Sequence, residues 1–370
     1  MKILQAITSL RIGGAEKLIT EIAPLLREKG HEVDVLAIDG MDTHFKRSLV
    51  DSGIKIISFG EHCSVYNVRF FLKMAKLMKN YDVVHTHITA PQLYGAFGSY
   101  FCKAKMVTTE HATSNRRRGN ILFKLMDKWM YSRYEKIISI SEPCDESLKA
   151  YLGTDYPFCI IRNGINIKRY TEAEPATLYL DNCKKITMVA GFRYEKDQPT
   201  LIRAISYLPE DYHILLVGDG EKRAELEELS LEEQNLKPSS IQDEHSMKTI
   251  GRIHFLGIRG DIPQILKASD VIVMSSHREG LSLSNVEGMC SGHPFVASDV
   301  EGLREVTKGY GLLFPHGDSK ALAETIIRLC TDKLYSDTIA LKCKERARQY
   351  DIQKMVDEYE EVYKSIKHNH

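Results

Sequence analysis

Short apolar segments alternate with amphipathic helical segments along this chain, and this alternation restricts the fold more than any other feature of the sequence. The apolar segments are rich in Val and Ile, which is typical of strands buried on both faces. A strand, a helix and a second strand in succession form a right-handed parallel unit. We therefore predict α/β architecture, with parallel sheets covered by helices on both faces.

The same pattern divides the chain into two halves of similar size. We predict strands at residues 2–8, 32–38, 54–59, 83–86, 106–109, 136–140 and 158–162 in the first half, and at 185–189, 212–217, 253–255, 271–274, 294–297 and 311–314 in the second, with closing helices at 319–329, 336–348 and 352–366. Two doubly wound, Rossmann-like domains that face a cleft follow from this order.

The domain boundaries are set by changes in composition. We assign residues 1–167 to an N-terminal domain, on which the C-terminal helix within 351–370 packs back, and residues 184–350 to a C-terminal domain. The polar stretch 168–183 between them is interpreted as a linker. The segment 230–248 is polar and aperiodic, so we expect a mobile surface insertion away from the site.

Charge and cysteine usage exclude several classes of protein. Residues 1–170 contain 25 Lys and Arg against 17 Asp and Glu, whereas the rest contains 25 against 33, so the two halves meet different partners or attract each other. No apolar run reaches the roughly 18 residues of a membrane span, and the eight cysteines lack any C-x-x-C spacing. We expect a soluble cytoplasmic protein without disulfides, and no nucleic-acid partner.

Ligands of open parallel sheets bind at the carboxyl ends of the strands. In the first half, Gly13 and Gly14 follow the first strand, where the N-terminus of a helix favours binding of an anion. These glycines do not form the G-x-G-x-x-G pattern of nicotinamide enzymes, so a nicotinamide cofactor is disfavoured. His85, His87 and His111 follow the fourth and fifth strands. Such histidines are either packed in the core or available to sugar hydroxyls, and three at one edge favour a site.

In the second half, two basic side chains follow the first strand. Arg193 and Lys196 are three residues apart at the start of a helix and are suited to neutralise a phosphate. Gly218 ends the next strand on an open turn, and Gly257 with Ile258 offers backbone groups for a nucleobase. Each of these segments alone is also compatible with an ordinary solvated turn.

The strongest local pattern is the loop and helix start at residues 277–289, which carries two carboxylates eight positions apart. Glu279 lies in the loop, whereas Ser284 and Glu287 have the spacing of a helix capping box. Carboxylates bind vicinal hydroxyls, and a helix N-terminus binds a diphosphate, so the segment is suited to a nucleotide sugar. Further donor-binding candidates here are Leu281, Ser282 and Leu283.

This Glu279 to Glu287 spacing resembles the E-x7-E signature of retaining family 4 glycosyltransferases, which have the glycosyltransferase B fold. The resemblance extends over nearly the whole chain. It implies that Arg193 and Lys196 clamp the donor diphosphate, that Glu279 holds a sugar hydroxyl and Glu287 the ribose, and that His111 belongs to the catalytic set. Gly288 departs from the alanine more usual after the second Glu.

We accordingly expect a retaining glycosyltransferase that moves a sugar from a nucleoside diphosphate sugar to a hydroxyl of a glycan or lipid-linked acceptor. UDP is the nucleotide expected in the donor, because it is the commonest one, and the expected process is cell-surface polysaccharide biosynthesis. A nucleotide-sugar 2-epimerase of the same architecture and a silent nucleotide-sugar binder remain alternatives. The chain contains no D-x-D pair, so we expect no metal and no other cofactor.

Acceptor contacts are expected from the first half, with His85, His87 and Arg116 as candidates. The segment 116–130 is basic and amphipathic and contains the single Trp. It suggests peripheral contact with an anionic membrane at its inner face. The alternative is a domain helix whose apolar face belongs to the core.

Overall fold

The computed structural model describes residues 1–11, 13–111, 120–244, 247–279 and 283–368. The chain forms two compact units, which are described separately. Unit 1 consists of Met1–Gly164 and Ile352–His370, and unit 2 of Ile165–Asp351. No helix in these described stretches is both long and apolar enough to span a bilayer.

Unit 1 is built on a seven-stranded parallel sheet in the order β3-β2-β1-β4-β5-β6-β7. The direction of winding reverses between β1 and β4, which makes their carboxyl ends the switch point where ligands bind in such sheets. The strands are β1 (Lys2–Ser9), β2 (Glu32–Asp39), β3 (Lys55–Gly60), β4 (Val83–His87), β5 (Lys105–Glu110), β6 (Lys136–Ser139) and β7 (Phe158–Ile160).

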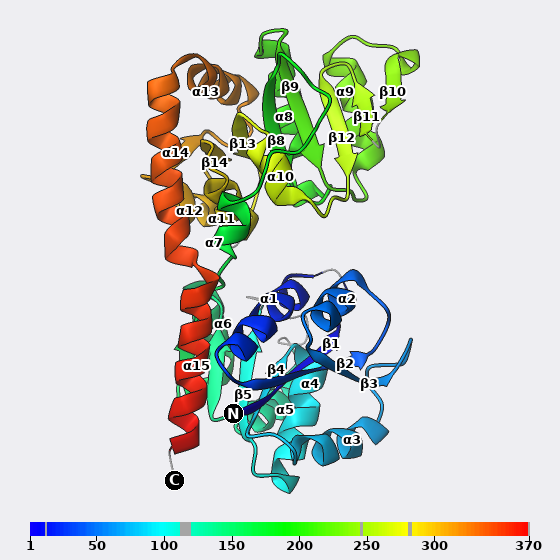
Figure 1. The fold of residues 1–370 in the computed structure, drawn as a ribbon, viewed down its shortest axis with the longest axis vertical. Helices are drawn as coiled ribbons and strands as arrows, with labels where there is room; N and C mark the ends of the chain where they lie inside the picture. Colours follow the sequence, from blue (N-terminus) through cyan, green and yellow to red (C-terminus); the bar gives the residue numbers. More distant parts are fainter. Residues whose placement is uncertain (12, 112–119, 245–246, 280–282, 369–370) are drawn as a thin grey trace. The chain divides into compact units, whose positions relative to one another are not determined.

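Helices cover both faces of this sheet (Figure 1). They are α1 (Gly14–Glu28), α2 (His44–Asp51), α3 (Arg69–Met78), α4 (Thr89–Gly98), the 3-10 turn η1 (Ser99–Phe101), α5 (Ile121–Tyr131), α6 (Glu142–Leu152) and α15 (Ile352–His368). Alternate residues of β1 face opposite layers: Ile3 packs with α1, α2 and α15, and Leu4 with α3 to α6. Helix α1 buries Leu18, Ile22 and Leu26, spaced four residues apart on one face.

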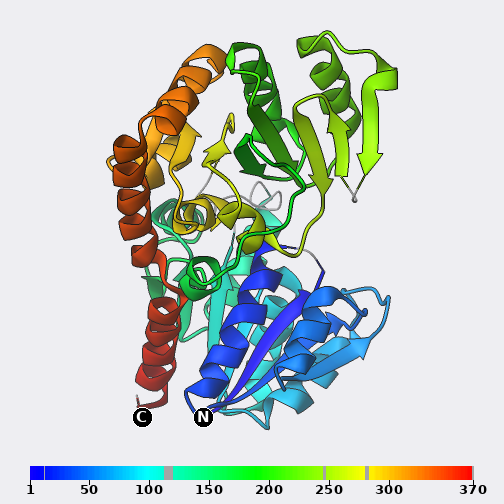
Figure 2. The ribbon, with the colours of Figure 1, turned by 45° about the horizontal axis from the view of Figure 1, so that its top comes forward.

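Helix α15 ends the described chain and packs on unit 1 beside α1 (Figures 1 and 2). Its apolar side buries Met355, Val356, Tyr359, Tyr363 and Ile366 in the core that α1 and β1 share. An ion-pair cluster outside this core joins Glu360 to Lys29, Lys364 and His31, and it lowers the pKa of Glu360 to about 2.

Unit 2 contains an eight-stranded sheet in the order β10-β11-β12-β9-β8-β13-β14-β15. Its strands are β8 (Lys184–Val189), β9 (Tyr212–Val217), β10 (Ile241–Glu244), β11 (Met247–Ile250), β12 (Ile253–Gly257), β13 (Val271–Met274), β14 (Phe295–Ser298) and β15 (Leu312–Phe314). The winding reverses between β8 and β13, so their carboxyl ends form the switch point of this sheet.

The helices of unit 2 are α7 (Ile167–Thr171), α8 (Gln198–Ala204), α9 (Arg223–Glu233), α10 (Ile262–Lys267), α11 (Leu283–Cys290), α12 (Glu301–Thr307), α13 (Ser319–Thr331) and α14 (Lys333–Ala347), with 3-10 turns η3 (Tyr194–Lys196), η4 (Ile205–Tyr207), η5 (Pro238–Ser240) and η6 (Arg348–Tyr350). Every predicted strand of both halves corresponds to a strand of the structure, and the fold class is confirmed.

Two predicted irregular segments are ordered parts of unit 2. The stretch 168–183 contributes α7, and its Leu178 is buried against Leu215, Leu256 and Ile265. The expectation of a mobile insertion at 230–248 is wrong, because β10 and β11 form an antiparallel hairpin that extends the sheet next to β12. The polar composition of this segment reflects its place at an edge of the sheet, where strands carry charged side chains.

Candidate functional site

Two predicted site residues that are far apart in the sequence form an ion pair at the switch point of unit 2. Lys196 follows β8, and its Nζ contacts Oε2 of Glu279, which follows β13. Ser276 Oγ donates to the same carboxylate oxygen at 3.2 Å. Both charged side chains are mostly buried, with 23% and 13% of their surface exposed, so the pair is held in a defined place.

Arg193 lies on the same loop as Lys196, three residues earlier in the chain. The backbone is fixed, because Lys196 N donates to Arg193 O and Arg193 N to Gly191 O. The side chain is exposed and makes no hydrogen bond or ion pair within the described part of the chain. A planar cation of this kind, next to a second cation, is suited to a dianionic ligand.

The glycines of the turn after β9 are required by close backbone packing. Gly218 has a φ of 140°, and a Cβ there would lie 2.1 Å from Ala190 O; a Cβ at Gly220 would lie 2.4 Å from Phe192 O. Gly218 N donates to Gly257 O at 2.9 Å, which ties the two turns together. Ile258 beyond them is exposed, so the predicted nucleobase edge is accessible.

Helix α11 begins at Leu283, one residue before the predicted N-cap. Ser284 therefore lies inside the helix, and the predicted capping box with Glu287 is wrong in register. Glu287 is buried within the helix, one turn after Leu283, at 5% exposure. Leu281 and Ser282 lie outside the described residues. A Cβ on Gly288 would lie 2.9 Å from the Phe295 ring, which accounts for glycine where the family more often has alanine.

In unit 1, Gly13 and Gly14 form the start of α1 at the switch point. Gly13 is the extended N-cap, and Gly14 is the first helical residue, with nothing within 4 Å of where its Cβ would be. Because the first N–H groups of a helix have no intrahelical acceptor, this turn can offer donors to an anion. Glu16 folds back over the turn, and its burial raises the pKa of the carboxyl group.

The acceptor-side interpretation of His85 is wrong, because its side chain belongs to the core of unit 1. None of its surface is exposed, and its Nδ1 and Nε2 lie 2.6 Å from Tyr363 Oη and 2.7 Å from Thr109 Oγ1. Burial, with a smaller effect of His111, lowers its pKa to about 3. His85 is the packed, hydrogen-bonded histidine that we considered as the alternative.

His87 is also fully buried and lacks the surface for an acceptor contact, but it links the core to His111. Its Nε2 lies 2.8 Å from Gln5 Oε1, and its Nδ1 lies 3.0 Å from Nε2 of His111. Gln5 in turn donates from Nε2 to Tyr363 Oη at 3.1 Å. A continuous series of hydrogen bonds therefore runs from helix α15 through β1 and β4 to the end of β5.

This series fixes the tautomer of His111. With its Nε2 donating to Gln5, neutral His87 has an acceptor at Nδ1, so Nε2 of His111 must donate and its Nδ1 carries a lone pair. Burial lowers the pKa of His111 to about 4, which keeps the ring neutral near pH 7. Neutral His111 is only partly buried, and it can accept a hydrogen bond from a hydroxyl group.

Gln5 and Tyr363 were not identified from the sequence. Gln5 lies within an apolar strand and Tyr363 within an amphipathic helix far along the chain, so nothing in the pattern joined them. A polar residue in the middle of a buried strand is the signal that could have identified Gln5. Arg116, the third acceptor-side candidate, lies outside the described residues.

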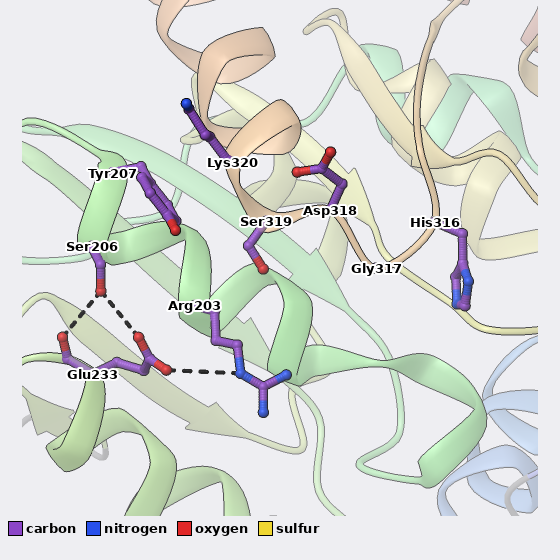
Figure 3. Close-up of a pocket in the computed structure, with 9 residues that line it drawn as sticks. All are labelled: Arg203, Ser206, Tyr207, Glu233, His316, Gly317, Asp318, Ser319 and Lys320. Atoms are coloured by element: carbon purple, nitrogen blue, oxygen red, sulfur yellow. Dashed lines mark hydrogen bonds and ion pairs between the residues drawn. The ribbon is translucent and has the colours of Figure 1, made fainter.

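A surface hollow of about 550 Å³ in unit 2 is lined by other residues (Figure 3). Its lining includes Arg203 and Glu233, whose Nε and Oε1 are 3.8 Å apart, and the loop from His316 to Lys320. None of the predicted donor-binding residues lines it.

Three side chains of unit 2 could hold a metal ion. Asp197, His277 and His316 each offer one ligand atom, and these atoms lie within 4.8 Å of one another. This group includes none of the residues predicted to bind the donor.

Comparison with known families matches each half of the chain. The model described as "Glycosyltransferase Family 4" matches residues 12–169, and that described as "Glycosyl transferases group 1" matches residues 183–332. The matched regions include Arg193, Lys196, Glu279 and His111.

Several curated proteins are similar over most of their length. An α-1,3-galactosyltransferase of Escherichia coli, named for UDP-Gal and an α-D-GlcNAc-diphosphoundecaprenol acceptor, is 24% identical over 81% of this chain and 80% of its own. An N,N'-diacetylbacillosaminyl-diphospho-undecaprenol α-1,3-N-acetylgalactosaminyltransferase of Campylobacter jejuni is 24% identical over 93% and 94%. A phosphatidyl-myo-inositol mannosyltransferase of Mycobacterium leprae is 24% identical over 96% and 93%.

Solved structures share the fold. Anabaena HepE in complex with UDP and glucose matches with a TM-score of 0.78 and 23% identity, over 99% of this chain and 100% of that chain. A glycosyltransferase from Rickettsia africae matches with a TM-score of 0.80 and 22% identity, over 100% and 99%. The predicted glycosyltransferase B type of fold is thereby confirmed.

Proposed function

The chain belongs to the family 4 glycosyltransferases, and from this premise we propose that it transfers a sugar, with retention, from a UDP-sugar to a hydroxyl group of a lipid-linked glycan. Cell-surface polysaccharide synthesis is the process that such a product serves. The UDP donor is supported by the UDP-Gal in the name of the E. coli relative and by the UDP bound to HepE. The lipid-linked acceptor is supported by the two diphosphoundecaprenol-dependent relatives.

The observation that carries this proposal is the Lys196–Glu279 ion pair, in which Lys196 lies on the same loop as Arg193. The exposed Arg193 side chain makes no hydrogen bond or ion pair within the described residues. Departure of a nucleoside diphosphate requires positive charge where negative charge develops, and preorganised donors supply most of that stabilisation. Arg193 would clamp the diphosphate as a planar fork, and Lys196 would neutralise it as a point charge. Glu279, already oriented by Lys196 and Ser276, would accept hydrogen bonds from hydroxyls of the donor sugar.

His111 is proposed to contact a hydroxyl group of the reacting sugars. Its neutral ring offers Nδ1 as an acceptor, and the hydrogen bond from its Nε2 to His87 holds the ring in one orientation. Gly14 N–H at the start of α1 would contribute to anion binding. Retention by front-face attack, in which the departing phosphate takes the acceptor's proton, is inferred from the family alone.

The alternatives give different products. An epimerase of the same architecture is not favoured, because the two family models and the named relatives are glycosyltransferases. It would convert the nucleotide sugar to its epimer without any acceptor, whereas a transferase hydrolyses it slowly. A silent binder would bind the donor without consuming it.

The central test is the Arg193→Ala variant. Losing one preorganised donor costs about 3–4 kcal/mol of barrier, so turnover of UDP-sugar should fall by roughly a factor of 100 to 1,000 while the melting temperature stays unchanged. Arg203→Ala is the matched control, since this arginine is also exposed but borders the separate surface hollow. Normal turnover in Arg193→Ala and Lys196→Ala would contradict the assignment.

We also propose that transfer needs no metal ion. The chain has no D-x-D pair to hold a divalent ion on the diphosphate, and Arg193 with Lys196 would supply the positive charge instead. Turnover should therefore persist after treatment with a chelator. Loss of activity in the chelator, restored by Mg²⁺ or Mn²⁺, would contradict this.

Peripheral membrane contact is proposed through helix α5. The last turn of this helix faces the core, where Met130 and Tyr131 are buried, but its first turns do not, because Ile121, Leu122 and Leu125 are exposed, at 69%, 72% and 60%. The Trp129 indole donates to Tyr100 Oη at 3.2 Å, which continues the apolar surface onto η1. The basic residues Lys103, Lys124, Lys128 and Arg133 lie on α5 or within a few residues of α5 or η1 in the sequence, and basic residues near an apolar surface favour an anionic bilayer.

Sedimentation with liposomes tests this contact. The protein should bind vesicles that contain phosphatidylglycerol, in a salt-sensitive way, and Leu122→Glu with Leu125→Glu should reduce binding at least tenfold. Leu334→Glu with Leu341→Glu is the matched control, since these exposed leucines lie on α14 of unit 2. Equal binding by both double variants would refute the role of α5.

A further inference from the structure

Three loops at the carboxyl edge of the unit 2 sheet bring a carboxylate and two imidazoles to one place. Asp197 follows β8 at the end of η3, His277 follows β13, and His316 follows β15. His277 Nδ1 lies 3.5 Å from Asp197 Oδ2 and 2.7 Å from His316 Nε2. The carboxylate is buried, at 3% exposure, whereas His316 is exposed and lies apart from Arg203 and Glu233 in Figure 3.

The arrangement of these atoms differs from a hydrogen-bonded relay. In a relay, the carboxylate would contact one ring nitrogen of the central histidine and the second histidine would contact the other. Here the same nitrogen, Nδ1 of His277, faces both Asp197 and His316. The 2.7 Å contact is a hydrogen bond between the two rings, whereas the 3.5 Å contact with Asp197 is longer than a normal hydrogen bond. A cation between the three atoms would satisfy all of them.

The distances are close to those of a coordinated ion. Zinc binds imidazole nitrogen and carboxylate oxygen at about 2.0–2.2 Å, so tetrahedral ligand atoms lie about 3.3 Å apart. The 2.7 Å and 3.5 Å separations fall on either side of this value, and the third pair, Asp197 with His316, lies within 4.8 Å, so coordination requires the side chains to shift. Since the described residues contribute three ligands, a water molecule would complete the tetrahedron.

The surrounding contacts tie the β8 and β13 loops to each other without an ion. Thr200 Oγ1 donates to Asp197 Oδ2 at 2.6 Å, and Ser275 Oγ donates to Asp197 O at 2.7 Å. His277 N donates to Glu195 O at 2.9 Å, so the β13 loop is tied to the β8 loop. Hydrogen bonds of this kind orient metal ligands in known sites. Asp197 also has a φ of 48°, a left-handed conformation that costs energy for a residue other than glycine.

We propose that Asp197, His277 and His316 form a binding site for a divalent transition-metal ion of the zinc type. Two imidazoles and one carboxylate suit zinc, and they suit magnesium or calcium poorly. The site is distinct from the diphosphate clamp and does not depend on the proposed function. It is also compatible with metal-independent transfer, because Arg193, Lys196 and Glu279 are not among its ligands. An ion there would link the loops of β8, β13 and β15.

The test uses protein stripped of metal and titrated with Co²⁺, and separately with Zn²⁺. Tetrahedral Co²⁺ has visible absorption that reports the geometry, and calorimetry with Zn²⁺ gives the stoichiometry. We expect one equivalent of Co²⁺ to bind with tetrahedral absorption and without sulfur charge-transfer bands. His316→Ala should weaken binding at least tenfold, and Asp197→Asn should do the same while keeping a residue that tolerates the left-handed backbone.

His213→Ala is the matched control. His213 and His254 form another pair of histidines in unit 2, with ring nitrogens 2.8 Å apart, and neither belongs to the proposed site. This variant should bind Co²⁺ like the unaltered protein. No uptake by the unaltered protein, or equal uptake by His316→Ala, would overturn the proposal. Loss of binding in His316→Ala but not in Asp197→Asn would also overturn it, because the carboxylate would then not be a ligand.

Discussion

Replacing Tyr363 by phenylalanine removes one hydroxyl group from the core of unit 1 and leaves the ring in place. That hydroxyl accepts from Gln5 Nε2 at 3.1 Å and lies 2.6 Å from His85 Nδ1, with no part of the side chain exposed. Each buried group left without a partner costs about 1–3 kcal/mol, and the Gln5 amide can turn to recover part of this. We expect the free energy of unfolding to fall by about 2–4 kcal/mol.

Tyr359→Phe is a matched control on the same helix. Tyr359 is equally buried, but its hydroxyl has only a long contact of 3.5 Å with Thr109 Oγ1. Its loss should cost less than about 1 kcal/mol. Urea unfolding of both variants, followed by circular dichroism, compares the two values. Equal destabilisation by the two substitutions would refute the view that the Tyr363 hydroxyl is an essential member of the hydrogen-bond series.

The same variant tests the connection to His111. Without the Tyr363 hydroxyl the Gln5 amide is free to turn, so His87 and His111 are no longer held in one tautomer. We expect a lower kcat and an altered pH profile, with little change in the KM for the donor. An unchanged profile despite the loss of stability would mean that Tyr363 acts only on folding.

Two further predictions concern glycine and pH. Gly14→Ala adds a methyl group into open space, so it should raise the free energy of unfolding by up to about 1 kcal/mol while weakening donor binding. Gly218→Ala would place Cβ 2.1 Å from Ala190 O at a φ of 140°, so it should lower the free energy of unfolding by at least about 3 kcal/mol. Thermal melts measure the two changes in stability, and UDP titration measures the change in donor binding. Lowering the pH should destabilise unit 1, because His85 and His111 have folded pKa values of about 3 and about 4 against 6.5 when unfolded. The unfolded chain binds more protons below pH 6.5, so each histidine should cost about 2 kcal/mol at pH 5, and a stability that is flat between pH 7 and pH 5 would contradict these values.

The sequence predicted the sheets and the residues at the unit 2 switch point. The strand pattern is local, and in a parallel sheet residues that follow neighbouring strands must come to one edge, which is why Lys196 and Glu279 could be expected near each other. That they form an ion pair depends on side-chain geometry that spacing does not reveal. The Ser284 and Glu287 capping box failed because the helix begins at Leu283, two residues before the first helical position that the motif predicts.

The histidines show where local patterns stop being informative. His85 and His87 are two residues apart and therefore point to the same side of β4, but only the tertiary structure brings Tyr363 against them. The exposure of the α5 leucines was equally inaccessible, since an apolar helical face has the same sequence pattern whether it is covered or not. The edge hairpin β10–β11 was missed because polar strands lack apolar alternation.

The position of α15 has a consequence for biosynthesis. Ribosomes synthesise a protein from its amino terminus, so Tyr363 emerges only after the whole of unit 2 has been translated. The delay is on the order of ten seconds or more. During this interval the nascent unit 1 exposes the apolar surface that α15 will cover and leaves Gln5 and His85 without their hydroxyl partner. Premature termination before residue 352 therefore yields a polypeptide that quality-control proteases should recognise as incomplete.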